Sequence, residues 1–247
     1  MRRFGQNLFQ WSYAAWMLIW FWGLFLLLYP FFWLIVQKPT WHRHYYLLSR
    51  LWAILFYLAI FVPVRVIRPR GLSRSKPAVY CPNHFSYLDI HLLTRTMPSF
   101  FIFVGLHDLE KIPLFGYMYR KIHITIDRSS PRSRYATFVK AKEALQRGKN
   151  LVIFPEGGIW SEDFPNMAPF KDGPFRIAIE AQVPIVPVSI LYNWKMLPLL
   201  DIKRLRWHSQ RVIYHPPIST EGLSVKDIPA LRQQTFELIQ AELSKTV

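Results

Sequence analysis

The sequence predicts an α/β protein in which a mixed sheet is flanked by helices and is preceded by a membrane-embedded hairpin of two helices. Two observations lead to this prediction. The N-terminal part holds a long stretch without charged side chains and then a second apolar run. From about Pro77 onward, short apolar runs alternate with amphipathic stretches, as strands and helices do in α/β folds. We therefore expect a membrane-associated helical hairpin over residues 1–64 and an α/β domain over residues 65–247.

The first apolar stretch runs from Trp11 to Val36 and contains tryptophan at positions 11, 16, 20, 22 and 33. It is long enough to span a bilayer with tilt. Pro30 is expected to kink or end the helix. A cleavable signal would be shorter and would end in small residues, so we expect the segment to be retained. So many tryptophans are typical of a membrane interface rather than of buried core helices in a soluble protein.

The second apolar run, Leu51 to Val64, is too short to cross a bilayer upright. With a basic, aromatic turn over residues 37–50, two helices dipping into one leaflet fit both lengths better than the alternative of two full spans. A basic cluster without acidic residues follows, at Arg65, Arg68, Arg70, Arg74 and Lys76. Such a cluster binds anionic head groups and marks the cytoplasmic side. We expect the protein at the cytoplasmic face of the inner (plasma) membrane.

The net charge is strongly positive, with 31 Lys and Arg against 15 Asp and Glu, or +16. Such a field attracts polyanions, and both nucleic acid and anionic lipid qualify. The basic residues follow apolar helices and no base-stacking motif is evident, which favours lipid and predicts no nucleic-acid partner. A single cysteine excludes an intramolecular disulfide. His42 and His44 fit an interfacial patch better than a zinc site, and we expect no metal.

The α/β part contains six candidate strands and two long candidate helices. Pro131 to Arg147 is predicted to be helical, with Ser129 or Ser130 as cap and Gly148 just past its end. Val225 to Ser244 is the second helix, and Pro229 is expected to mark its start. The predicted strands are Ala78–Cys81, Phe100–Val104, Ile122–Ile126, Leu151–Phe154, Ile185–Ile190 and Arg211–Tyr214.

A base and an orienting carboxylate are suggested by His84 and Asp89, which follow the first of these strands. A neutral imidazole can take a proton from a hydroxyl, and a carboxylate on its other nitrogen fixes the tautomer. Residues five apart lie about 140° apart on a helix, so His84 should precede a helix that Ser86 caps and Asp89 begins. The alternative is that Ser86-x-x-Asp89 only starts the helix, as a capping box.

The nucleophile is expected to be the substrate's hydroxyl. No G-x-S-x-G turn occurs, and Cys81 follows an apolar run that predicts burial in the core. A second motif, Phe154-Pro155-Glu156-Gly157-Gly158, also follows a predicted strand directly. Ligands of open α/β sheets bind outside the carboxyl ends of the strands, so both motifs are candidates for one site.

Four blocks resemble the 1-acylglycerol-3-phosphate acyltransferase family, the PlsC type of glycerolipid acyltransferase, in the family's order. The family's N-H-x4-D box is similar to Asn83-His84 through Asp89, and its F-P-E-G box to Phe154–Gly157 with Lys171 following. The remaining blocks resemble Ile112–Gly116 through Ile126-Asp127-Arg128 and Val183-Pro184-Ile185-Val186-Pro187-Val188. The match covers roughly residues 77–190, and the N-terminal helices also resemble those of bacterial members.

This resemblance implies a glycerolipid-acyltransferase-like fold and transfer of an acyl group from acyl-CoA or acyl carrier protein to the hydroxyl of a lysophospholipid, giving phosphatidic acid. Membrane lipid, the lysophospholipid acceptor and the thioester donor are the implied partners, and no separate cofactor is implied. His84 would act as base and Asp89 would hold it. Backbone N–H groups around Gly157 and Gly158 would stabilise the oxyanion. Glu156 would organise the loop or bind the acceptor.

Arg128 would pair with the acceptor's phosphate, although without the resemblance it reads as one of several surface cations. The sequence departs from the family after Gly157, where Gly158-Ile159-Trp160-Ser161 stands in place of Thr-Arg-Ser. Lys171 or Arg176 could replace the lost arginine. The departure leaves glycerol 3-phosphate, another lysophospholipid or a lyso-aminolipid open as acceptors, and a non-catalytic lipid-binding protein remains a further alternative.

Overall fold

The computed structural model describes residues 2–70, 72, 76–106, 110–127, 129–161, 163–198 and 204–246, without the side chains of residues 2–8 and 106. The chain divides into two units. The first contains residues 1–66, 84–97 and 190–212, and the second contains residues 67–83, 98–189 and 213–247. Arg128, which the sequence predicts to bind phosphate, and Arg74 of the basic cluster lie outside the described residues.

Within the described residues, the strands are hydrogen-bonded in the order β1-β7-β6-β2-β5-β3-β4. β2 pairs in parallel with β5 and β6, and β3 pairs in parallel with β4 and β5. Val79 lies opposite both Leu151 and Ile185, and every residue of β2 and β6 is buried, as expected of central parallel strands. The strands are β1 Val64–Ile67, β2 Val79–Pro82, β3 Phe101–Leu106, β4 Ile124–Ile126, β5 Asn150–Val152, β6 Ile185–Leu191 and β7 Gln210–Tyr214.

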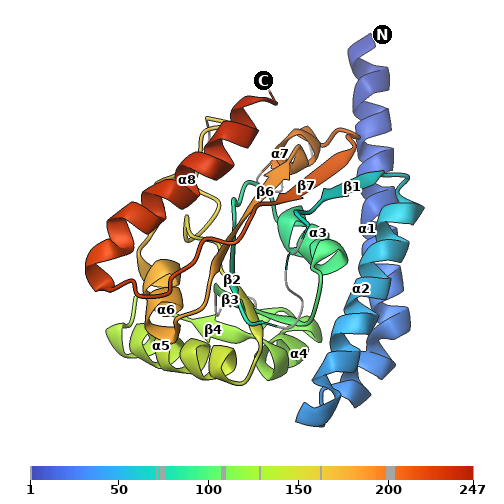
Figure 1. The fold of residues 1–247 in the computed structure, drawn as a ribbon. Helices are drawn as coiled ribbons and strands as arrows, with labels where there is room; N and C mark the ends of the chain where they lie inside the picture. The colour runs from blue at the N-terminus through green and yellow to red at the C-terminus, as the bar shows by residue number, and fades with distance from the viewer. Residues whose placement is uncertain are drawn as a thin grey trace. The chain divides into compact units, whose positions relative to one another are not determined.

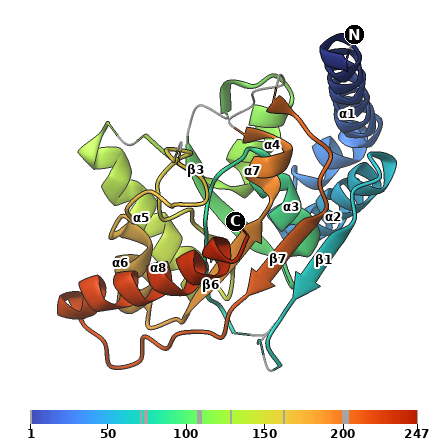
Figure 2. The ribbon, with the colours of Figure 1, turned by 90° about the horizontal axis from the view of Figure 1, so that it is seen from above.

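The helices confirm the predicted α/β class. In the second unit, α5, α6 and α8 lie next to one another (Figure 2). The helices are α1 Arg2–Ile35, α2 His42–Ala59, α3 Leu88–Thr96, α4 Phe115–Ile122, α5 Pro131–Gln146, α6 Gly173–Ala181, α7 Asn193–Met196 and α8 Ile228–Ser244, with short 3₁₀ turns at Pro39–Trp41 and Val225–Asp227.

Helices α1 and α2 run side by side in the first unit (Figure 1). The indole Nε1 of Trp16 donates to the carbonyl of Ala59 at 2.9 Å, and Nε1 of Trp52 donates to that of Phe21 at 3.3 Å. The Trp52 ring also contacts the ring of Phe25. These contacts hold the two helices together along their lengths. That both helices are embedded in a membrane stays a prediction.

Two details of this region differ from the sequence-based expectation. α1 continues through Pro30 to Ile35 instead of ending there. Phe25 and Phe32 contact Trp52 on either side of that position, so packing outweighs the hydrogen bond that proline cannot make. The turn is also shorter than residues 37–50, because α2 begins at His42. Buried side chains at Tyr45, Ser49, Trp52, Ala53 and Phe56 recur every three or four residues and carry the helix through the basic segment.

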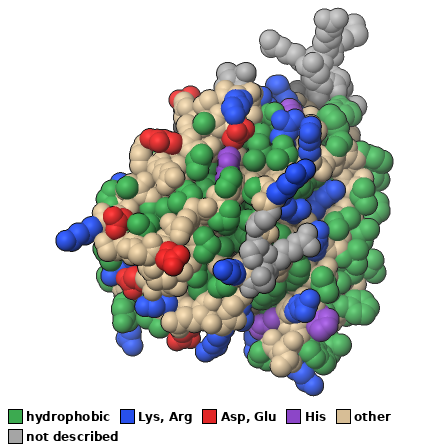
Figure 3. All heavy atoms as spheres, in the orientation of Figure 1, with side chains coloured by type: hydrophobic (Ala, Val, Ile, Leu, Met, Phe, Trp, Pro, Cys, Tyr) green, Lys and Arg blue, Asp and Glu red, His purple; other side chains and the backbone are tan. Residues whose placement is uncertain are grey.

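An apolar surface covers much of the outside of α1 and α2, as Figure 3 shows on its right-hand side. Phe9–Ile35 is long and apolar enough to cross a membrane, and most of its hydrophobic window is not buried within the protein. A core helix of a soluble protein would be covered instead. The exposed apolar residues here are Phe9, Trp11, Trp16, Leu18, Ile19, Trp22, Leu26, Leu27, Phe31, Trp33, Leu34, Leu47, Leu51, Leu55 and Leu58.

The two long helices of the α/β part were predicted closely. Ser130 caps α5, its side chain accepting the N–H of Ser133 at 3.2 Å, and Gly148 follows the helix with a positive φ of 75°. α8 begins at Ile228, one residue before Pro229. The strand predicted over Ile122–Ile126 was wrong at its start: Ile122 ends α4, and only Ile124–Ile126 form β4. β1, α4, α6 and α7 were not predicted.

Candidate active site

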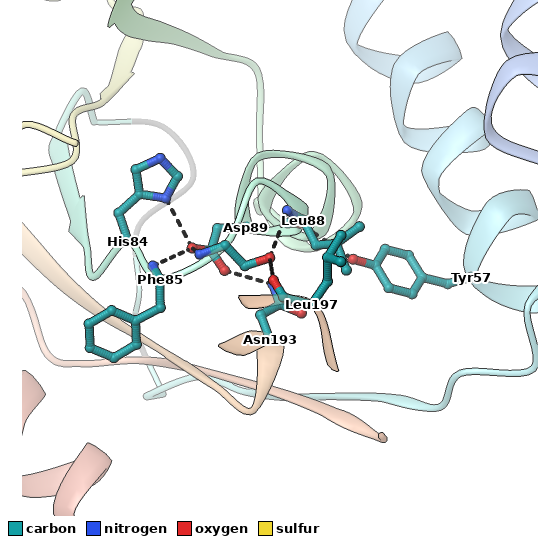
Figure 4. Close-up of polar contacts among 8 residues, drawn as sticks. Tyr57, His84, Phe85, Leu88, Asp89, Asn193 and Leu197 are labelled. Atoms are coloured by element: carbon teal, nitrogen blue, oxygen red, sulfur yellow. Dashed lines mark hydrogen bonds and ion pairs between the residues drawn. The ribbon is translucent and has the colours of Figure 1, made fainter. Parts of the chain in front are cut away.

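His84 and Asp89 are in direct contact in the first unit (Figure 4). Nδ1 of the imidazole lies 3.0 Å from Oδ2 of the carboxylate. His84 stands in the loop after β2, and Asp89 lies in the first turn of α3. The prediction that the histidine precedes the helix is therefore confirmed. Asp89 is fully buried and His84 is 7% exposed.

Asp89 is held by three further donors. Its Oδ2 accepts the backbone N–H groups of Phe85 at 2.8 Å and Ser86 at 2.9 Å. Its Oδ1 accepts Nδ2 of Asn193 at 2.7 Å. A buried carboxylate is tolerated only when its oxygens are bonded in this way. Because an ionised carboxylate can only accept, the proton in its contact with His84 belongs to Nδ1, and the lone pair of the neutral ring is on Nε2.

The capping box expected from Ser86 and Asp89 is only half formed, the expectation that Ser86 caps the helix was wrong, and Asp89 also pairs with His84. Asp89 accepts the N–H of Ser86, as the acidic residue of a capping box does. The Ser86 hydroxyl is bonded differently: its Oγ accepts the N–H of Leu88 at 3.2 Å and donates to the carbonyl of Leu197 at 2.7 Å. The N-cap position of α3 is Tyr87 rather than Ser86. One carboxylate thus begins the helix and contacts the imidazole.

The segment 193–197, which is α7 and the residue after it, contacts the dyad and its loop: Asn193 donates to Asp89, and the carbonyl of Leu197 accepts the hydroxyl of Ser86. Sequence reasoning missed it. A signal was available, because Asn193 follows the end of β6 much as His84 follows the end of β2, and polar residues after parallel strands gather at one edge of a sheet.

Helix α3 is fixed by aromatic contacts around His91. The His91 ring lies 4.5 Å from that of Trp52, 4.9 Å from that of Phe56 and 5.3 Å from that of Phe21, measured between centroids. Its Nε2 has no hydrogen-bond partner among the described residues. Burial lowers the pKa of His91 to about 3, so the ring is neutral at physiological pH. α1 and α2 therefore support the helix that carries Asp89.

The Phe154–Gly158 loop belongs to the second unit. Glu156 is fully buried, and its Oε2 accepts the N–H of Ala168 at 3.1 Å. The N–H of Lys171 donates to the carbonyl of Pro155 at 2.8 Å, which places the backbone of exposed Lys171 against the loop. The structure thus brings together Glu156, Gly157, Gly158 and Lys171.

The two glycines of the loop serve different purposes. Gly157 has a positive φ of 81°, a conformation that favours glycine, and its N–H donates to the carbonyl of Phe154 at 3.1 Å. At Gly158, a Cβ would lie 2.7 Å from the indole of Trp160. The tryptophan ring therefore lies against the residue where the resembled family carries threonine. A larger side chain at position 158 would clash with the Trp160 ring, so this position of the ring requires glycine at 158.

The predicted site residues thus fall in different places. His84 and Asp89 lie in the first unit, and Glu156, Gly157, Gly158 and Lys171 lie in the second. Arg128 is outside the described residues. That all of them serve one site stays a prediction. Arg176, considered as a substitute phosphate ligand, donates from Nε to Glu180 at 2.9 Å.

Cys81 is not a candidate nucleophile. It is fully buried in β2, and burial raises the pKa of its thiol. The expectation that it faces the core is confirmed. Among the described residues, no group of three or more His, Cys, Asp or Glu side chains is placed to hold a metal ion.

The fold and the dyad define a class: an α/β protein in which an imidazole, oriented by a buried carboxylate at the end of a parallel strand, can activate a hydroxyl. The family described as Acyltransferase matches residues 63–191. The chain belongs to this acyltransferase family.

Two relatives are named as acyltransferases, in agreement with this family. The chain is 30% identical over 200 residues to a chloroplastic 1-acyl-sn-glycerol-3-phosphate acyltransferase of Arabidopsis thaliana, covering 79% of this chain and 54% of that one. It is 30% identical over 186 residues to the 1-acyl-sn-glycerol-3-phosphate acyltransferase of Saccharomyces cerevisiae, covering 74% and 60%. The chain thus spans little more than half the length of these relatives.

The crystal structure of the 1-acyl-sn-glycerophosphate acyltransferase PlsC from Thermotoga maritima has the same fold. It superposes with a TM-score of 0.76 and covers 99% of this chain and 97% of that chain. Sequence identity over the match is 19%, so this likeness establishes the architecture alone.

Proposed function

We propose that the protein transfers a fatty acyl group from the thioester of acyl-CoA or acyl carrier protein to the free hydroxyl of 1-acylglycerol 3-phosphate, giving phosphatidic acid. The observation that carries the proposal is the 3.0 Å contact between Nδ1 of His84 and Oδ2 of Asp89. The names of the relatives from Arabidopsis thaliana and Saccharomyces cerevisiae support the choice of acceptor.

In the proposed reaction, Nε2 of His84 takes the proton of the acceptor hydroxyl as its oxygen attacks the thioester carbonyl carbon. A new C–O bond forms and the carbonyl becomes a tetrahedral oxyanion. Collapse of that intermediate breaks the C–S bond, and the imidazolium returns the proton to the departing thiolate. Asp89 keeps the ring in place and stabilises its positive charge between the two transfers.

The loop of the second unit is proposed to serve the acceptor and the oxyanion. Lys171 is exposed and its backbone is tied to the loop, which supports a role in binding phosphate. Arg128 is proposed to share that role. Glu156 is proposed to organise the loop, since its carboxylate is buried and bonded to the Ala168 N–H. The Gly157 N–H could serve the oxyanion only by exchanging its bond to Phe154 for the substrate.

A second candidate keeps the reaction and changes the acceptor. The Trp160 ring lies against Gly158, in a loop where the resembled family carries a Thr-Arg pair. Ile159 stands in place of the arginine, so the charge of a guanidinium is lost from the loop. This departure keeps glycerol 3-phosphate, another lysophospholipid or a lyso-aminolipid open as alternative acceptors.

The test uses the purified full chain in detergent, with radiolabelled palmitoyl supplied on CoA and, separately, on acyl carrier protein. Lysophosphatidate, glycerol 3-phosphate and a neutral lysolipid are compared as acceptors. Product from lysophosphatidate alone is expected. Product only from another acceptor would favour the second candidate. No product from any pairing would contradict both and favour a non-catalytic lipid-binding protein.

We further propose that α1 and α2 anchor the protein at the cytoplasmic face of the inner (plasma) membrane. The exposed apolar surface of α1 supports this proposal, as do the exposed side chains of Arg65, Arg68 and Arg70, which follow α2 in the sequence. Replacing Ile19 and Leu27 by lysine should reduce flotation with anionic vesicles, because both are highly exposed, at 65% and 70%. Tyr135→Lys, at a residue 72% exposed on α5, is the control. Undiminished flotation of the double variant would place the anchor elsewhere.

A further inference from the structure

Asn193 contacts the dyad, and neither the sequence analysis nor the proposed reaction gives it a role. It is 1% exposed and lies at the first position of α7. Its Nδ2 donates to Oδ1 of Asp89 at 2.7 Å across 104 residues of sequence (Figure 4). The amide orientation follows from chemistry, because a carboxylate oxygen has no proton to give and must face the NH₂ group. Both residues belong to the first unit.

The side chain of Asn193 is not needed by its own helix. The N-terminus of α7 has no side-chain cap, and the helix end is closed through the backbone, with Leu197 N–H donating to the Asn193 carbonyl at 2.8 Å. The amide Oδ1 has no hydrogen-bond partner among the described residues. A buried polar atom left unbonded costs free energy, so an apolar side chain of the same size would suit the fold better. The amide is therefore explained by its donor atom and by Asp89.

The backbone around Asn193 is fixed. Tyr192, before it, has a left-handed φ of 79° and is the N-cap residue of α7. At the other end of the segment, the carbonyl of Leu197 accepts the hydroxyl of Ser86 at 2.7 Å, and the carbonyl of Met196 accepts the N–H of Arg206 at 2.8 Å. The segment is thus joined to the His84–Asp89 loop at both ends. A donor on so constrained a backbone can fix the rotation of the Asp89 carboxylate.

We propose that Asn193 is a positioning residue: by holding Oδ1 of Asp89, it directs Oδ2 at Nδ1 of His84 and keeps the imidazole in the tautomer with its proton on Nδ1. Without this donor, the carboxylate is held only through Oδ2, by His84 and the Phe85 and Ser86 N–H groups, and its rotation about the last side-chain bond is less constrained. His84 then samples the other tautomer, in which Nε2 carries the proton and cannot act as base. The catalytic consequence rests on the proposed function, whereas the tautomer does not.

The kinetic test compares Asn193→Leu, which keeps the branching and the number of heavy atoms of the side chain and removes the donor, with wild type. Loss of such a supporting hydrogen bond is expected to lower kcat about 10- to 100-fold, with KM for donor and acceptor within about twofold, because binding is untouched. Asn193→Ala is the second variant. It removes the donor without adding bulk or charge, so the same loss is expected if Asn193→Leu does not fold.

Gln210→Leu is the matched control. Gln210 is 2% exposed, its Oε1 also lacks a partner among the described residues, and its Nε2 contacts the sulfur of Met196 in α7 at 3.5 Å. The substitution removes a similar buried amide beside α7 without touching Asp89. It is expected to leave kcat within about twofold of wild type.

A readout independent of turnover separates this inference from the proposed function. In ¹⁵N-histidine-labelled protein, the His84 signals, assigned by their loss in His84→Ala, should show a protonated Nδ1 and a lone pair on Nε2 in wild type and in Gln210→Leu. They should shift toward the Nε2-protonated form in both Asn193 variants. Wild-type signals and kcat in the Asn193 variants would overturn the inference. A wild-type protein without transferase activity would contradict the proposed function alone, because the tautomer measurement would still decide the role of Asn193.

Discussion

Oδ2 of Asp89 lies 3.0 Å from Nδ1 of His84 and also accepts the N–H groups of the two residues that follow the histidine. The pair is therefore formed by a loop that curls around the carboxylate, and no helix face is shared. Because the backbone of the same loop supplies both the histidine and two of the donors, the loop brings base and carboxylate together, while Asn193 holds the other carboxylate oxygen.

Asp89→Asn should lower kcat by about 10²- to 10⁴-fold with little change in KM. The amide oxygen can accept the three donors that Oδ2 accepts, but its NH₂ group then faces the NH₂ group of Asn193, and a neutral amide does not stabilise the imidazolium charge. The measurement is the steady-state rate of acyl transfer at saturating substrates, with circular dichroism as a check on folding. A folded variant with kcat near that of wild type would remove Asp89 from the mechanism.

Glu156 offers a test of loop organisation. Glu156→Leu should lower the free energy of unfolding by about 1–3 kcal/mol, because the Ala168 N–H loses its buried acceptor. Glu156→Gln keeps an oxygen for that N–H and should lie much closer to wild type. Denaturant unfolding in detergent micelles measures both. If Gln lost as much stability as Leu, the negative charge of Glu156 rather than its hydrogen bond would hold the loop.

Lys171→Ala should raise KM for lysophosphatidate about tenfold, or about 1.4 kcal/mol, because an ammonium group is lost from a phosphate. KM for an acyl acceptor without phosphate should not change. Lys140→Ala, an exposed lysine on α5, serves as control. Equal effects of the two lysine substitutions would indicate a general electrostatic effect and no specific contact.

His91→Phe should make the free energy of unfolding less dependent on pH below about 6.5. The pKa of His91 is about 3 in the folded protein against a reference of 6.5. Between these values the unfolded chain binds a proton that the folded chain does not, so the contribution is complete above about pH 6.5 and falls as the pH decreases toward 3. From pH 6.5 to 5, wild type should lose about 2 kcal/mol more than the variant in the free energy of unfolding. Parallel pH profiles would mean that His91 is protonated in the folded state.

Sequence signals predicted those features of the structure that depend only on residues near one another in the chain. Ser130 caps the start of α5 and Gly148 follows its end, as their residue types indicate. The spacing of His84 and Asp89 correctly predicted that the histidine precedes α3. Elements that depend on distant packing were missed. Pro30 was expected to kink or end α1. The helix continues to Ile35, because its residues on both sides of Pro30 contact Trp52 in α2.

The donor from Asn193 could not be paired with Asp89 from the sequence, because 104 residues separate them and the contact depends on how the chain folds. β1 was missed for a different reason. Its residues Val64, Arg65, Val66 and Ile67 include a charge and adjoin an apolar run, so they read as the end of a helix and the start of a basic cluster. Short edge strands carry weak patterns of this kind.

The most direct test of the account is acyl transfer to lysophosphatidate by purified His84→Ala, measured beside wild type with the same thioester donor. The account predicts that wild type forms phosphatidic acid and that the variant loses at least about 10²-fold in kcat while still floating with vesicles. Wild-type rates in a folded, membrane-bound His84→Ala protein would contradict the assignment of His84 as the base.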